Sequence, residues 1–299
     1  MLLLIGRRLQ RGLSYNHFMN IDLHTHSFFS DGENSPEEIV LEAVRKGVTL
    51  LSITDHNFLP EAELLKLSEK RISLIQGIEI STLFKTSTSE ISLHVLGYGK
   101  KLNHRLLNKE LMGTVGGYNR RAQSIIAMLN KEFSTLNLDF KSLSVQNNEA
   151  YVSRNTLARL LVEHLKGAIS IKDALKQYVF VQEDNSWMMS PKESFRLIIS
   201  AGGIPVLAQS GRELQKMGLV KYEKMVSEFV KDGLLGLEIY YPRNTSENIN
   251  VMRGVAKRFG LYITGGSDWH GHTYTPEFKI GQEVPREEVV SFLNDRRIN

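Results

Sequence analysis

The sequence predicts an α/β protein, because three observations recur along its 299 residues. Short apolar runs that fit buried strands alternate with amphipathic stretches that fit helices. Polar segments follow the strands, and they carry histidines or carboxylates. This alternation implies a parallel sheet or barrel, in which loops at the carboxyl ends of the strands build the active site. The length allows one large α/β barrel or two modest domains.

The first strand introduces the pattern. Residues 21–23 fit a short buried strand, and His24 and His26 follow it at a spacing of two. Residues i and i+2 of an extended backbone point the same way, so the two imidazoles project side by side with Asp22 behind them. Asp31 adds a carboxylate in a nearby Ser-Asp-Gly turn. Paired imidazoles at a strand end suit Zn, Mn or Fe.

The next hundred residues repeat the order of strand, polar exit and helix. A capping box and a proline predict a helix over 35–47, which a glycine ends. The following elements are expected in this order: strand 48–53, helix 60–70, strand 72–75, polar exit 77–81 and strand 91–96. His56 follows the first of these strands, Glu79 lies in the exit, and His94 lies in the last strand.

Residues 100–190 interrupt the alternation and predict an inserted helical cap. The helices expected inside it span 118–130, 154–165 and 171–178. The alternation then resumes with these elements: helix 191–201, strand 204–208, strand 234–241, helix 247–259 and strand 261–264. The last exit carries Asp268 and His270. Residues 1–18 precede the first strand and are interpreted as an N-terminal extension of a domain over 19–299.

The composition is that of an ordinary globular protein, with 41% hydrophobic and 23% charged residues. A net charge of +4 fits an anionic substrate without a concentrated nucleic-acid patch. The absence of cysteine excludes disulfides, thiolate metal sites and cysteine nucleophiles. The sequence has no run of about 18 apolar residues, so we expect no membrane span and a cytoplasmic protein.

The candidate ligands recur at independent strand ends. Any one of them alone is more often a structural residue, such as a hydrogen-bonded histidine, a helix cap or a turn carboxylate. Together, histidines and carboxylates without cysteine favour Mn, Fe or Zn over Ca. Eight ligands exceed the need of one ion, so we expect two or three ions with Glu79 as a bridge. The eight are His24, His26, Asp31, His56, Glu79, His94, Asp268 and His270.

These motifs resemble the polymerase and histidinol phosphatase (PHP) family of metal-dependent phosphoesterases. The resembling segments, in the order of the family, are DLHTHS with SDG, TDHN, GIEIS, HVLGY, GGIPVLAQSGR, GLEIYYP and GGSDWHG. The resemblance covers nearly the whole chain from Met19. It implies a distorted seven-stranded β/α barrel, similar to a TIM barrel, with a trinuclear site at its C-terminal face. The helical cap resembles the subgroup that acts on nucleotides and on the 5′ ends of short oligonucleotides.

The resemblance also implies three ligand sets. The first comprises His24, His26, Glu79 and Asp268, the second Asp31, His56 and His270, and the third Glu79 and His94. Three positions depart from the family pattern, because Gln209, Thr156 and Asn244 stand where histidines are usual. A neutral amide oxygen is a poorer ligand than imidazole for these ions. We therefore predict two tightly bound ions and one that is weak or absent.

The predicted function is a metal-dependent phosphoesterase that attacks phosphorus with a metal-activated hydroxide. His56, His270 and Asp268 are the catalytic candidates. Arginine matches phosphate bidentately, although a solvated helix position remains open for each arginine. The candidate substrate contacts are Arg121, Arg154, Gln209, Arg212 and Asn244. The expected partner is a phosphorylated small molecule or a short nucleic-acid end. Three alternatives stay open: an amino-alcohol phosphatase such as histidinol phosphatase, a non-catalytic nucleotide- or metal-binding protein, and an amidase.

Overall fold

The computed structural model describes residues 17–60, 72–87, 89–146, 151–181, 185–273 and 277–299. Within them the chain has an α/β fold, which confirms the predicted class. The predicted helix 60–70 lies outside the described residues apart from its first position. The predicted extension 1–18 does so apart from residues 17 and 18, and Phe18 already begins the first strand.

The described strands form two sheets. The first has the order β3-β2-β1-β9 and comprises β1 (Phe18–Thr25), β2 (Leu50–Ile53), β3 (Ser73–Leu74) and β9 (Gln282–Pro285). The second has the order β4-β5-β6-β7-β8 and comprises β4 (Gln76–Lys85), β5 (Glu90–Gly99), β6 (Ile204–Leu207), β7 (Gly236–Tyr240) and β8 (Tyr262–Gly265).

The sheets are mixed rather than wholly parallel, which corrects the expectation. β4 pairs antiparallel with β5, β5 with β6, and β1 with β9. The polar exit expected over 77–81 is part of the long strand β4, because its residues pair continuously with β5. Isolated bridges from Thr25 to Trp269 and from His56 to Glu79 connect the two sheets. The closed seven-stranded barrel remains a prediction, since the described strands pair as two sheets.

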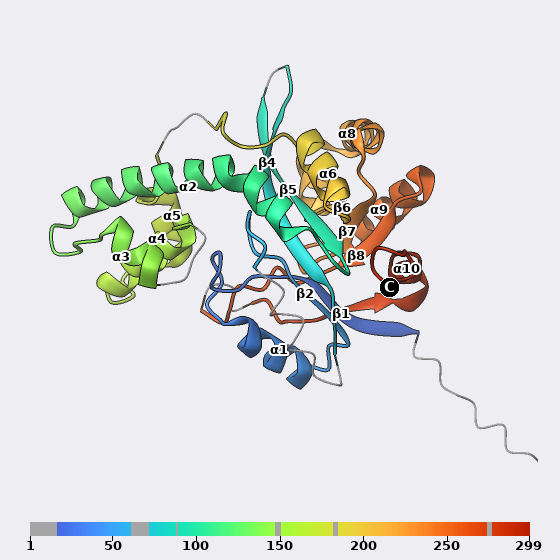
Figure 1. Ribbon diagram of the computed structural model, residues 1–299, viewed down its shortest axis with the longest axis horizontal. Coiled ribbons are helices and arrows are strands. Elements are labelled where there is room, and N and C mark those ends of the chain that lie inside the picture. Colours follow the sequence, from blue (N-terminus) through green and yellow to red (C-terminus); the bar gives the residue numbers. More distant parts are fainter. Residues whose placement is uncertain (1–16, 61–71, 88, 147–150, 182–184, 274–276) are drawn as a thin grey trace, which may run out of the picture.

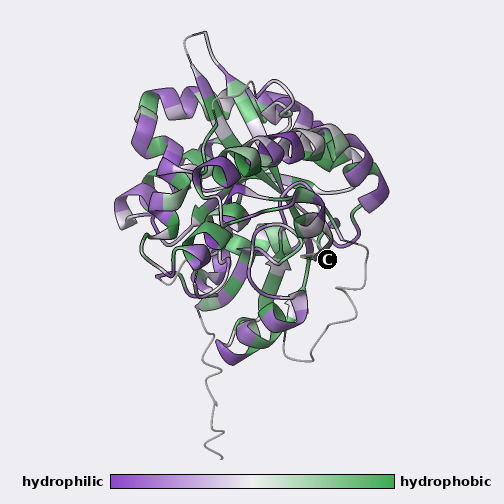
Figure 2. Cartoon of the chain, turned by 90° about the vertical axis from the view of Figure 1, so that its left-hand side faces the viewer, coloured by the Kyte–Doolittle hydropathy of each residue, from purple (hydrophilic) through white to green (hydrophobic). Residues whose placement is uncertain are grey.

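The helices flank the sheets in Figure 1. α1 (Pro36–Arg45) lies beside β1 and β2, and its capping box is present, since the Ser35 hydroxyl accepts from the Glu38 amide and the Glu38 carboxylate accepts in return. The C-terminal half adds α6 (Pro191–Ser200), α7 (Ser210–Met217), α8 (Leu219–Asp232), α9 (Ser246–Phe259) and α10 (Arg286–Leu293). Buried residues of these helices, such as Phe195, Val226 and Val255, join the main hydrophobic core. Figure 2 shows hydrophobic and hydrophilic residues mixed along the helices of the chain.

Four further helices project to one side of the sheets (Figure 1). They are α2 (His104–Glu132), α3 (Phe140–Gln146), α4 (Arg154–His164) and α5 (Ile171–Gln177). They bury a hydrophobic cluster of their own, which includes Ile125, Leu157 and Val179, apart from the main core under the sheets. We refer to α2–α5 as the helical cap. Among the described residues, no helix is both long and apolar enough to span a membrane.

Candidate metal centre

The eight predicted ligands converge where the two sheets meet, with Glu79 inside β4, His94 inside β5 and the others at or after the ends of strands. They form three overlapping groups, and within each group one donor atom from every residue lies within 4.8 Å of the others. The groups are His24, His26, Glu79 and Asp268; His26, Asp31, His56 and His270; and His56, Glu79 and His94. The fold thus brings together residues that lie more than 200 positions apart in the sequence, and their role as metal ligands stays a prediction.

Glu79 lies at the centre of the first and third groups. Its Oε2 is 3.2 Å from His24 Nε2, 3.1 Å from His26 Nε2 and 3.1 Å from His56 Nδ1. Among the described residues, these four atoms are buried without a hydrogen-bond partner. Buried polar atoms are nearly always satisfied, and leaving one unsatisfied costs about 1–3 kcal/mol. Four such atoms pointing at one another are the arrangement that ligands of a cation adopt.

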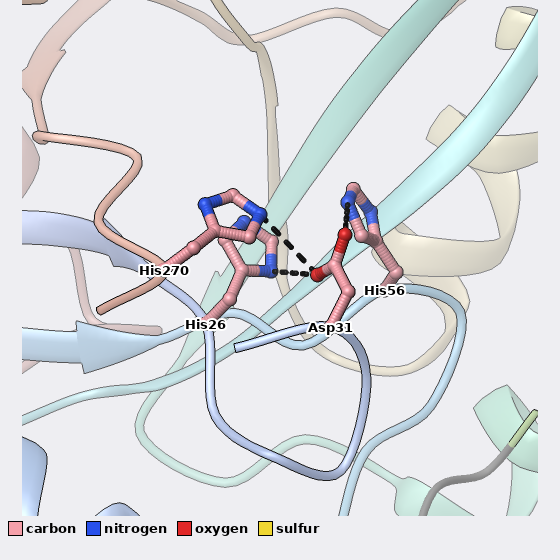
Figure 3. A group of neighbouring side chains, drawn as sticks. All are labelled: His26, Asp31, His56 and His270. Atoms are coloured by element: carbon pink, nitrogen blue, oxygen red, sulfur yellow. Dashed lines mark ion pairs between the residues drawn. The ribbon is translucent and has the colours of Figure 1, made fainter. Parts of the chain in front are cut away.

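Asp31 connects three histidines in the second group, as Figure 3 shows. Its Oδ1 lies 3.2 Å from His270 Nε2 and 3.8 Å from His26 Nδ1, and its Oδ2 lies 3.9 Å from His56 Nε2. The His26 and His270 rings stack with centroids 4.1 Å apart. One carboxylate therefore faces imidazoles from β1, from the exit of β2 and from the loop after β8.

Two buried aspartates hold the loops that carry these ligands. Asp22 accepts from both the amide and the hydroxyl of Ser267, at 2.9 and 2.6 Å, which fixes the loop of Asp268. Asp55 accepts from the hydroxyls of Ser27 and Ser30, each at 2.6 Å, which fixes the loop of Asp31. These hydrogen bonds orient the loops that carry Asp268 and Asp31 in the protein without a bound ion.

Backbone strain is stored at the same strand exits. Asp268, Asn57 and Gln209 have left-handed backbone angles, with φ of 57°, 54° and 46°. Such conformations are uncommon outside glycine and cluster at functional sites. At Asp268 the strained turn directs Oδ1 to within 3.3 Å of both His24 Nε2 and His26 Nε2. The left-handed backbone at position 268 therefore positions the Asp268 carboxylate beside these two imidazoles.

The carboxylates and imidazoles shift each other's protonation. Burial lowers the pKa of His26, but the Asp268 and Glu79 carboxylates outweigh burial and raise that pKa to about 10. Burial lowers the pKa of His56 to about 4 against the opposing pull of Glu79 and Asp31. Burial opposes ionisation of Glu79, yet the surrounding imidazoles hold its pKa well below the usual range. Without a cation, these shifts favour a proton on His26 beside an ionised Glu79 and a neutral His56.

Glu238 is a residue that sequence reasoning missed. It is fully buried in β7, and its Oε1 lies 2.9 Å from His24 Nδ1. Its Oε2 accepts a hydrogen bond from the backbone N–H of Gln209 at 2.7 Å. A carboxylate on the far nitrogen of a ligand histidine fixes the ring and its tautomer. The available signal was a glutamate inside an otherwise apolar strand, because buried charges are rare unless paired.

Gln209 and His94 already have hydrogen-bond partners among the candidate ligands. The Gln209 amide nitrogen donates to Asp268 Oδ2 at 2.7 Å, so that this side chain is engaged with the first group. His94 Nδ1 lies within hydrogen-bond distance, 2.9 Å, of Glu79 Oε1. Neither of these two atoms is buried without a hydrogen-bond partner, unlike the nitrogen atoms around Glu79 Oε2. The side chains of Gln209 and His94 are therefore satisfied without a cation.

A cavity of about 650 Å³ opens beside the metal centre. Asp31, His56 and His94 line it from the strand ends, and the predicted contacts Arg121 and Arg154 line it from the helical cap. Such a volume is typical of sites for small ligands, which span ~300–1,000 Å³. The Arg121 guanidinium also lies 4.8 Å from the centroid of the Trp187 ring.

Two other predicted contacts are held elsewhere. Arg212 lines a separate hollow with Ser92 and Glu213, and it donates to the Ser92 carbonyl at 3.1 Å. The Asn244 amide donates to the Ile239 carbonyl at 2.7 Å, which is a structural hydrogen bond within the loop after β7. Neither residue lines the cavity beside the metal centre, so their roles as substrate contacts remain predictions.

A comparison with known families finds one match, to the model described as the PHP domain, over residues 22–196. This match covers more than half of the chain and includes six of the eight converging ligands. Asp268 and His270 lie beyond its end, although they share the geometry of the matched ligands.

Curated relatives match most of the chain. It is 28% identical over 264 residues to the 5′-3′ exoribonuclease Rnm of Escherichia coli K12, covering 85% of this chain and 86% of that protein. It is 28% identical over 259 residues to a 3′,5′-nucleoside bisphosphate phosphatase of Chromobacterium violaceum, covering 84% and 87%. A solved structure from Bifidobacterium adolescentis, described as a metal-dependent phosphoesterase, shares the fold with a TM-score of 0.74 and 24% identity, covering 91% and 94%.

Proposed function

The chain belongs to the PHP domain family, and from this premise we propose that it is a metal-dependent phosphoesterase. Its proposed substrates are phosphate esters of nucleotides or the 5′ ends of short oligonucleotides. The names of two relatives support this substrate class, since one is a 5′-3′ exoribonuclease and the other a nucleoside bisphosphate phosphatase. The cavity lined by two arginines is also of the kind that a phosphate group requires.

The observation that carries the proposal is the set of buried donors around Glu79 Oε2 without hydrogen-bond partners. Imidazole nitrogens and carboxylate oxygens form a donor set that fits Mn, Zn or Fe. We propose that His24, His26, Glu79 and Asp268 would hold one ion, and that Asp31, His56 and His270 would hold a second. A third position, at Glu79 and His94, would be weak or empty because Gln209 is engaged with Asp268. When bound, such ions lower the pKa of water and stabilise charge on phosphoryl oxygens.

The chain's own residues divide the remaining tasks. His56 lines the cavity and is the histidine proposed to lie beside the leaving oxygen, with His270 as the second candidate. Asp268 is proposed to fix the imidazoles of the first group, since its Oδ1 lies 3.3 Å from two of them. Arg121 and Arg154 would bind phosphate oxygens from the side of the helical cap.

We also propose two finer features of the architecture. Residues 100–190 would be an insertion into a domain over 19–299, which is supported by the separate hydrophobic cluster of the helical cap. The two sheets would act together as a distorted β/α barrel, which is supported by the isolated bridges at Thr25 and His56. Both features would bring the cap over the face where the strands deliver their ligands.

Turnover of a defined substrate panel tests the function. The panel contains a nucleoside 3′,5′-bisphosphate, a 5′-phosphorylated dinucleotide, an amino-alcohol phosphate and an amide, each assayed with added Mn²⁺, Zn²⁺ or Fe²⁺. Phosphate or nucleotide release that a chelator abolishes and added metal restores is the expected result.

The other outcomes select among the alternatives. Preference for the amino-alcohol phosphate would favour a small-molecule phosphatase, and cleavage of the amide alone would favour an amidase. Metal binding without turnover of any panel member would leave a binding protein and would contradict the proposed enzyme.

A further inference from the structure

The cavity beside the metal centre has two chemically distinct sides. Asp31, His56 and His94 lie on the side formed by the strand ends. The side formed by α5 and the segment after it carries apolar side chains, namely Leu175, Phe180 and Val181. A ligand that fills the cavity therefore meets charged groups at the candidate metal centre and, on the side of the cap, this apolar surface beside Arg121 and Arg154. A phosphate group attached to a flat apolar ring system has this division.

Phe180 is the unusual member of the apolar side. Its side chain is 59% exposed, although the preceding residue, Val179, is fully buried in the cluster of the helical cap. Single exposed hydrophobic residues are normal on protein surfaces. Among the described residues, however, Phe180 is the one exposed large hydrophobic side chain that lines this cavity. Exposed phenylalanine elsewhere, such as Phe18 at 53%, does not.

Arg154 holds the segment that presents this ring. Its Nε donates to the Val179 carbonyl at 2.7 Å, and its Nη2 donates to the Leu175 carbonyl at 2.9 Å. The guanidinium carbon lies 5.9 Å from the centroid of the Phe180 ring. The backbone next to Phe180 is thus tied to the first residue of α4, and a cationic group lies beside an exposed aromatic ring.

We propose that Phe180 is a stacking platform for a nucleobase of the substrate. This inference rests on the proposed function, which puts a nucleotide phosphate at the metal centre, and it adds the group that recognises the base. An aromatic ring accepts any base by its flat face, and a neighbouring arginine adds a cation–π contribution. The platform therefore selects base-containing phosphates over simple ones without selecting a sequence.

The test uses three matched 5′-phosphorylated dinucleotides. One carries both bases, and in each of the other two an abasic ribose replaces one of the bases. KM is measured for the wild type, for Phe180→Ala and for Phe180→Tyr, with Phe18→Ala as the control for an exposed phenylalanine elsewhere. The wild type should favour a base at one position. Phe180→Ala should reduce that preference by about 5- to 150-fold, the range of base–aromatic stacking measured by alanine substitution. Phe180→Tyr and Phe18→Ala should keep it.

Calorimetric binding of AMP and of ribose 5-phosphate separates this inference from the proposed function. A wild type that hydrolyses no phosphate ester contradicts the function, but weaker AMP binding by Phe180→Ala alone would still support the platform. Equal loss for substrates with and without the base, or an unchanged ratio of the two KM values, would overturn the platform and leave the phosphoesterase intact. Equal binding of AMP and ribose 5-phosphate to the wild type would likewise overturn the platform.

Discussion

The Asn155 amide nitrogen donates a hydrogen bond to Asp31 Oδ2, which joins residues 124 positions apart in the chain. Asn155 is the second residue of α4 in the helical cap, whereas Asp31 belongs to the second ligand group. The bond leaves Asp31 Oδ1 facing His270 Nε2 at 3.2 Å. The helical cap therefore contacts the candidate metal centre through Asp31, a proposed ligand, and this contact helps to orient the Asp31 carboxylate.

Replacing Asn155 should weaken one metal site. Asn155→Leu keeps the branched shape but removes the donor, so we expect a 10- to 100-fold loss of affinity for one ion, as is typical when a partner of a ligand is lost. Titration with Mn²⁺ followed by electron paramagnetic resonance measures the affinity directly. Asn130→Leu is the control, because the Asn130 side chain bonds the backbone of Leu138 within the cap and lies outside the ligand groups. Equal weakening in both variants would assign the effect to the fold of the cap.

Glu79 should be indispensable. Glu79→Gln keeps the size of the side chain but removes the charge that faces four imidazoles and would serve the bound ions. Activity should therefore fall by well over 100-fold, beyond the effect of losing an outer contact. Initial rates on the best panel substrate give the measurement. Glu213→Gln is a matched control, since Glu213 is 1% exposed and lies outside the three ligand groups. Activity of Glu79→Gln within about threefold of the wild type would refute a bridging role.

Glu238 should act through His24. Glu238→Gln leaves a side chain of the same shape but removes the charge 2.9 Å from His24 Nδ1. We expect metal affinity to fall by about 10- to 100-fold while the folded state persists. Thermal unfolding of the metal-free variant and calorimetric titration with Zn²⁺ distinguish the two effects. Unchanged metal affinity would show that Glu238 only accepts the hydrogen bond from the backbone N–H of Gln209 and does not act through His24.

Metal binding should release protons and strengthen as pH rises. The pKa of His26 is raised to about 10 from an ordinary 6.5, so a cation must displace its proton at neutral pH. Affinity should therefore rise by up to about tenfold per pH unit for each displaced proton. The stability of the metal-free protein should change in the opposite direction and fall as pH rises. The stabilisation from protonated His26 is complete below pH 6.5 and is lost as pH rises toward 10.

Calorimetry in two buffers of different ionisation enthalpy measures the proton release, and urea unfolding of the metal-free protein between pH 6 and pH 9 measures the stability. His104→Gln is a control outside the ligand groups. Metal affinity that does not change with pH would show that the histidines of the centre are already neutral.

Local signals in the sequence predicted several helix ends, although α3, α7 and α8 were not expected. The capping box of Ser35 and Glu38 is present, and α9 ends at Gly260, whose φ of 66° suits glycine. The alternation of His24 and His26 also placed two imidazoles together, because both contact Glu79 Oε2. Such features depend on residues a few positions apart, so a single sequence contains them.

Features that depend on distant pairing were missed. β9 and α10 were not expected, because the pairing of Gln282–Pro285 with β1 is decided by the tertiary fold rather than by local pattern. The antiparallel pairing of β4 with β5 was missed for the same reason. At the site, the link from Asn155 to Asp31 and the contact of Glu238 with His24 join separate parts of the chain. Neither contact has a spacing that a sequence could display.

We predict that Gln209 limits the number of ions that the candidate centre holds. The histidines and carboxylates of the third group are only His56, Glu79 and His94 in the described part of the chain, and two of them also serve other ions in the proposed assignment. Gln209→His would offer an imidazole at this strand exit, and histidine tolerates the left-handed backbone found there. We expect metal content to rise from two ions per chain toward three. Activity should rise too if the third ion assists the reaction.

Gln209→Leu separates the two consequences of that change. It removes the 2.7 Å hydrogen bond to Asp268 Oδ2 without adding a ligand, so its metal content should stay at two or fall. Metal content is measured by inductively coupled plasma spectrometry after extensive dialysis. A wild type that retains three ions per chain would show that the amide at position 209 does not limit the third site, since a neutral oxygen is otherwise too weak a donor to hold such an ion.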